Sequence, residues 1–181
     1  MTTLNGLPAH ALLVHAVIVL VPLTAVLLVL TTLWPAARQR LAIANAVLAT
    51  VTLAAVPLTT EAGDWLEHHV QRSALVSQHT QLGDTLLPWA GGLFLVAVAV
   101  AARELLRTRL RSTAHGPGTA AATELRRLPI GGKAVTAALA ALAIVVGVGA
   151  VVDTYLIGDS GARAAWTDHF SQQQLWGRPQ G

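Results

Sequence analysis

Long runs of hydrophobic residues alternate along the chain with short polar segments. Each run is about as long as the roughly 20 apolar residues that a helix needs to cross the hydrocarbon core of a bilayer. The four runs cover residues 11–33, 41–60, 85–102 and 134–152. Since a membrane-spanning chain must pair its own backbone groups, this pattern predicts an all-α integral membrane protein. We expect an antiparallel four-helix bundle that forms a single transmembrane domain over residues 1–181.

The segments that connect the runs differ in charge. A turn at residues 36–40 and a long connection at residues 103–133 hold nine of the twelve Lys and Arg residues. Basic residues near the ends of spans mark the cytoplasmic side. We therefore expect a multi-pass protein of the bacterial cytoplasmic membrane, with the basic connection 103–133 in the cytoplasm and both termini outside. After the fourth run, Ala162, Trp166 and Phe170 recur every four residues, which predicts a short interfacial C-terminal helix.

Composition narrows the classes of function. The chain is 54% hydrophobic and only 12% charged, which is too apolar for a soluble globule of 181 residues. The chain has no cysteine, so thiolate-held iron–sulfur clusters and thioether-attached haem are excluded. No phosphate-binding glycine loop or nucleophile motif favours an enzyme. The basic residues have a topogenic role, so the predicted partner is the lipid bilayer and no nucleic acid. A redox membrane complex or a second copy of the chain are further candidate partners.

Histidines and carboxylates gather at the predicted outer ends of the runs. Six of the seven histidines and seven of the nine acidic residues fall on this side. Counting about 20 residues outward from each basic boundary reaches one ionisable residue per helix. These residues, at one level, are His15, Glu61, Asp84 and Asp153. A second level, further out, holds His10, Asp64, His68 and His79.

These side chains have the chemistry of a haem or metal site. Imidazole binds Zn, Cu and Fe, and carboxylates complete such sites or orient the rings. A four-helix bundle also holds cofactors between side chains of facing helices. The candidate haem b ligands are His10, His15 and His79, with His79 paired to one of the other two. The candidate residues for a transition metal (Zn, Cu or Fe) are His68, Asp64, Glu61 and Asp84, and the spacing of four between Asp64 and His68 places both on one helix face.

Three functions are consistent with this pattern. The first is a membrane protein that binds haem b or a transition metal near its outer face and serves electron transfer or metal handling. The second is a structural or assembly subunit without a cofactor, whose polar residues close the end of the bundle and form a docking surface. The third is a proton or ion conductor, which the apolar runs 17–33 and 134–152 disfavour because they offer no ionisable residue.

Four short motifs resemble a bacterial membrane-protein family known as domain of unknown function 2231. They are His10–His15, Glu61–Gly63, His79 with Gly83-Asp84, and Gly158–Ala162. Two departures lie beside the histidines, since Ala11 stands where the family usually has proline and Ala16-Val17 replaces Phe-Pro. The resemblance implies a four-helix membrane fold. It also implies a redox setting, because related architectures are joined to c-type cytochrome or Rieske-like domains.

Overall fold

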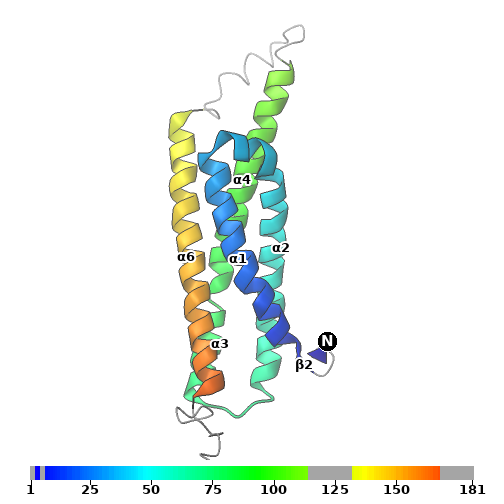
Figure 1. The fold of residues 1–181 in the computed structure, drawn as a ribbon, viewed down its shortest axis with the longest axis vertical. Coiled ribbons are helices and arrows are strands. Elements are labelled where there is room, and N and C mark those ends of the chain that lie inside the picture. Colours follow the sequence, from blue (N-terminus) through cyan, green and yellow to red (C-terminus); the bar gives the residue numbers. More distant parts are fainter. Residues whose placement is uncertain (1–2, 5–6, 114–131, 168–181) are drawn as a thin grey trace, which may run out of the picture.

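The long helices of the described chain pack side by side as a bundle (Figure 1). The computed structural model describes residues 3–4, 7–113 and 132–167. Its long helices are α1 (Ala9–Leu33), α2 (Pro35–Glu67), α4 (Leu86–Thr113) and α6 (Lys133–Trp166), and a short helix, α3 (Ala74–Gly83), precedes α4. A small antiparallel pair, β1 (Thr3–Leu4) and β2 (Leu7–Pro8), leads into α1. The predicted all-α membrane bundle is confirmed.

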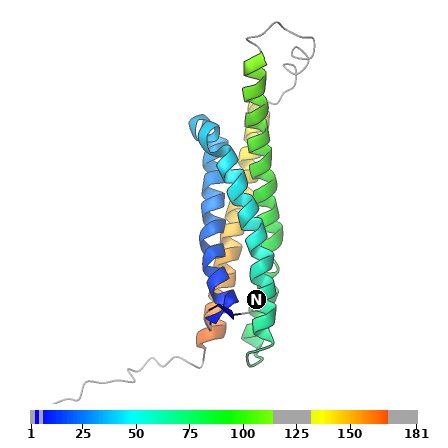
Figure 2. The same ribbon diagram turned by 90° about the vertical axis from the view of Figure 1, so that its right-hand side faces the viewer.

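The helices form a closed ring of contacts. α1 packs against α2 and α6, and α4 packs against the same two helices from the other side (Figure 2). By length and composition, the described chain offers four helices able to cross a membrane, with α3 and α4 together supplying one of them. The histidine end holds His10 and His79, and the arginine end holds Arg38 and Arg103.

Small side chains fill the interior, and large aliphatic ones cover the outside. Ala49, Ala143 and Ala150 are fully buried, whereas Val19 and Leu95 are more than 60% exposed. Association of helices in lipid depends on close packing, which small residues allow. The exposed aliphatic surface is therefore the face that meets lipid tails.

The helices extend past the apolar runs that predict them. α2 begins at Pro35, directly after the single residue Trp34, and continues to Glu67. Proline suits this first helical position because its missing N–H would be unpaired there. α6 continues without a break to Trp166, so Ala162 and Trp166 belong to α6 in place of a separate interfacial helix. Phe170, the third residue of that predicted helix, lies outside the described residues.

Candidate functional site

A cavity of about 1,000 Å³ opens between α1, α2, α3 and α6 at the histidine end. Apolar side chains such as Val17, Val56 and Leu86 supply most of its surface. The candidate residues on its lining are His10, His15, Asp64, His79 and Asp84. A cavity of this volume lies at the upper end of the range for small-molecule and cofactor sites, about 300–1,000 Å³.

His10 lies in the first turn of α1, and its ring is fixed against α2. Its Nδ1 lies 2.9 Å from the carbonyl oxygen of Thr59. Because a carbonyl only accepts hydrogen bonds, Nδ1 carries a proton, and in the neutral form of the ring the free lone pair is on Nε2. The ring passes directly over Gly63, where an added Cβ would lie 3.0 Å from His10 Cε1.

His79 lies on α3, and its ring is fixed against α6 in a similar way. Its Nδ1 lies 3.0 Å from Ser160 Oγ, and the Ser160 hydroxyl donates to the Ile157 carbonyl over 2.8 Å. With its own proton directed to Ile157, Ser160 accepts from His79 Nδ1–H, so this ring also keeps its lone pair on Nε2. A Cβ added to Gly161 would lie 2.9 Å from His79 Cε1.

The two rings face the same cavity and lie next to each other. Their centroids are 6.2 Å apart and their planes are inclined by 76°. Each ring is half-buried. Among the described residues, neither Nε2 has a hydrogen-bond partner. The sequence predicts a pair of haem ligands made of His79 with His10 or His15, and in the structure the His10 ring lies next to His79.

His15 also lines the cavity but is held differently. Its Nδ1 lies 2.6 Å from the carbonyl of Ala11 on its own helix, and the side chain is exposed. No ring contact joins it to His79 among the described residues. His15 thus stands beside the His10–His79 pair.

Of the four candidate metal residues, Asp64 and Asp84 lie on the cavity lining, whereas His68 and Glu61 do not. His68 Nδ1 bonds to the backbone carbonyl of Asp64 over 2.7 Å, and both side chains are exposed. Glu61 is exposed and lies off the cavity lining, whereas Asp84 lies on it. Within residues 3–4, 7–113 and 132–167, no three His, Cys, Asp or Glu side chains come together in a group that could hold a metal ion.

Four residues that position the two rings cannot be recognised from the sequence by their ligand chemistry. Thr59 contributes its backbone carbonyl, which no side-chain pattern reports. Ser160 contributes a hydroxyl whose role depends on α3 lying against α6. Gly63 and Gly161 provide space for the rings, and both fall within the motifs Glu61–Gly63 and Gly158–Ala162.

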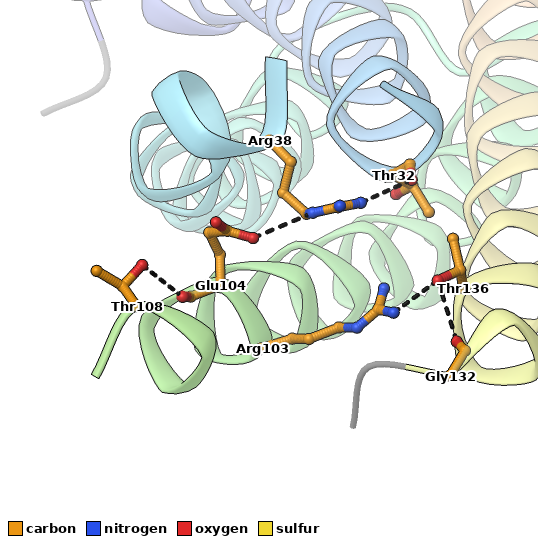
Figure 3. Close-up of polar contacts among 7 residues, drawn as sticks. All are labelled: Thr32, Arg38, Arg103, Glu104, Thr108, Gly132 and Thr136. Atoms are coloured by element: carbon orange, nitrogen blue, oxygen red, sulfur yellow. Dashed lines mark hydrogen bonds and ion pairs between the residues drawn. The ribbon is translucent and has the colours of Figure 1, made fainter. Parts of the chain in front are cut away.

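Charged side chains of α2 and α4 make polar contacts at the arginine end of the bundle (Figure 3). Arg38 Nε lies 3.1 Å from Glu104 Oε2, and the two side chains are only 8% and 13% exposed. Arg38 also donates to the carbonyl of Thr32 over 3.3 Å. Nearby, Arg103 donates to Thr136 Oγ1 over 2.6 Å. These contacts join α2 to α4 and α4 to α6.

Fold and cavity together define a four-helix membrane protein with a histidine-lined pocket at one end. The chain belongs to the family described as "Predicted membrane protein (DUF2231)", which matches residues 6–174. No curated protein and no solved structure matches the chain.

Proposed function

We propose that the cavity at the histidine end binds haem b between His10 and His79, and that the protein serves electron transfer at the outer face of a bacterial cytoplasmic membrane. The observation that carries this proposal is the state of the two rings, each held through Nδ1 with its Nε2 lone pair free. Histidines that ligate metals are generally oriented in this way, by a hydrogen bond from the other ring nitrogen to a fixed oxygen.

The separation of the rings supports the proposal that both would hold the same iron. Two imidazoles that each bind a metal through nitrogen at about 2.0–2.1 Å have ring centres about 6 Å apart when the nitrogens face each other. The observed separation is 6.2 Å. A haem iron needs only two protein ligands because the macrocycle supplies the rest, whereas a free ion takes three or four from the protein. The pair therefore suits haem better than a free ion.

The apolar lining suits the faces of a porphyrin. The charged residues on the lining would interact with the propionates. Of the Lys and Arg residues that the structure describes, Arg72 alone is on the lining, whereas Asp64, Glu67 and Asp84 supply acidic side chains. If haem binds, Arg72 would pair with a propionate, whereas the three carboxylates would repel the propionates. Once bound, haem supplies a one-electron redox centre. His10 and His79 orient it, and the apolar walls limit the access of water.

An absorption spectrum of the purified protein, oxidised and dithionite-reduced, tests the proposal. We expect a Soret band and a reduced α band typical of two histidine ligands, both lost in His10→Ala and in His79→Ala. His69→Ala is the matched control, because its ring is exposed and stacks on Trp65 away from the cavity. His15→Ala should keep the bands; loss there and retention in His10→Ala would assign the ligand to His15.

A transition metal is the second candidate, and the charge of the lining favours it. Asp64, Glu67 and Asp84 form no ion pair among the described residues, so the lining attracts cations. Elemental analysis of the same sample distinguishes the two candidates. A colourless protein with stoichiometric Zn, Cu or Fe would replace haem by a metal ion. A colourless protein without metal would leave the structural or assembly subunit as the function.

A further inference from the structure

Polar side chains recur every seven residues along the contact between α1 and α2. On α1 they are Thr24 and Thr31, and on α2 they are Arg38, Asn45, Thr52 and Thr59. All six are buried. A spacing of seven returns to the same helix face, so these residues form one seam through the bundle.

Most members of the seam satisfy their own hydrogen bonds. Thr31 donates to the Leu28 carbonyl and Thr59 to the Ala55 carbonyl. Thr24 and Thr52 bond to each other over 2.9 Å. Asn45 differs, because its Nδ2 and Oδ1 are both buried without a hydrogen-bond partner, in a residue that is only 1% exposed.

The neighbours of Asn45 follow from the register of the helices. Since α1 and α2 are antiparallel, moving seven residues on each helix from the Thr24–Thr52 pair toward the arginine end brings Thr31 level with Asn45. Moving seven residues from the Arg38–Glu104 pair toward the histidine end brings Ala97 of α4 level with Asn45. Ala97 is buried, and its side chain is a single methyl group. The Thr31 oxygen can accept a bond, because its proton is directed to Leu28.

We propose that the Asn45 level is a binding site for one or two internal water molecules. A buried carboxamide is costly in hydrocarbon unless its donors and acceptors are paired. A water molecule can accept from Asn45 Nδ2–H, and water can donate to Asn45 Oδ1 and to Thr31 Oγ1. These are the two to four polar partners that buried waters typically have. The site lies about 7 Å of helical rise inward from Arg40, in the half of the bundle near the arginine end.

The site is enclosed. Leu28 and Ala49, both fully buried, separate it from the Thr24–Thr52 pair. Ala42 and Val100, also buried, lie between it and the Arg38–Glu104 pair. The water is therefore isolated from the histidine-end cavity and from the arginine end. The seam is a row of separate polar sites with buried apolar side chains between them.

Asparagine labelling makes this site directly measurable, because the chain contains only two asparagines, Asn5 and Asn45. The full chain in liposomes, labelled with ¹⁵N at asparagine side chains, is expected to show two amide signals in solid-state NMR. The signal that disappears in Asn45→Leu belongs to Asn45. We expect this signal to receive magnetisation from water and to exchange with D₂O at least tenfold more slowly than the side-chain amide of free asparagine under the same conditions.

Two results would overturn the proposal. An Asn45 amide that correlates only with protein protons has a protein partner, and an Asn45 amide that exchanges as fast as free asparagine is open to bulk solvent. Thr50→Val is the matched control, since Thr50 lies on the same helix, is exposed and bonds to its own helix at Ala46. It should leave the water signal unchanged. Ala97→Leu should remove the water transfer while the Asn45 signal remains, and persistent transfer would contradict the register.

Discussion

At the arginine end, Arg38 and Glu104 join α2 to α4 through a buried ion pair, whereas at the histidine end His10 and His79 each hold one hydrogen bond to a neutral oxygen. The charged pair fills its space and needs both members, since a lone charge in a dry interior is costly. The neutral rings border a cavity of about 1,000 Å³ and each keeps a free nitrogen. The same four helices therefore form a closed end that fixes the packing and an open end that can receive a ligand.

Glu104→Ala, at the arginine end, should cause the largest loss of stability. It leaves Arg38 buried without its carboxylate, and removing one partner of such a pair costs about 3–5 kcal/mol. Unfolding by SDS titration in mixed micelles measures the loss. Replacing both residues, in Arg38→Met with Glu104→Leu, should recover most of the stability; a double variant as unstable as Glu104→Ala would show that the ion pair is not the cause.

Gly161→Ala, at the histidine end, should cause an intermediate loss of stability. The new Cβ lies 2.9 Å from His79 Cε1, so the ring must move, and forced overpacking costs about 1–3 kcal/mol. Gly158→Ala is the matched control on the same helix, because an added Cβ there meets nothing within 4 Å. Equal stability of the two variants, measured by the same titration, would contradict the close approach of His79 to α6.

Ser160→Ala should cost about 1 kcal/mol, the typical net value of one hydrogen bond. It should also release the His79 tautomer, which ¹⁵N chemical shifts of the ring report. Thr59→Val gives the contrast, because His10 bonds to the backbone carbonyl of residue 59 and keeps its tautomer when the hydroxyl is lost. A change of the His10 tautomer in Thr59→Val would refute this assignment.

Arg163→Ala should cause the smallest loss of stability. Arg163 pairs with Asp159 over 2.8 Å on one face of α6, but the two side chains are 67% and 41% exposed. Exposed pairs of this kind contribute at most about 0.5 kcal/mol. A loss above 1 kcal/mol in the SDS titration would mean that Arg163 has a second role, and would weaken the contrast between a charged end and a neutral end.

The fold could be predicted from the sequence because the length of an apolar run is set directly by bilayer thickness. The partners of individual side chains could not. His10 and His15 differ by about 140° around a helix, so the choice between them depends on how α1 is rotated in the bundle. The position of Arg38 in a short polar turn suggests an exposed residue. Its burial follows from α2 starting at Pro35 and from Glu104 lying opposite.

The continuation of α6 to Trp166 could not be predicted from the sequence for a related reason. Gly158 and Gly161 resemble breakers in a tail that follows an apolar run. In the structure they lie within α6, and Gly161 gives His79 of α3 the room to approach. Small residues in a membrane helix can mark a close contact as well as an end, and the contact is visible only when the second helix is in place.

The link between α1 and α2 constrains how the chain enters the bilayer. Only Trp34 separates them, and its N–H still donates to the Leu30 carbonyl over 2.9 Å. The two spans are therefore expected to leave the translocon together as a helical hairpin, with no intermediate in which α1 alone has settled. A glycosylation-mapping series of truncated chains would contradict this if α1 reached its final orientation before α2 emerged.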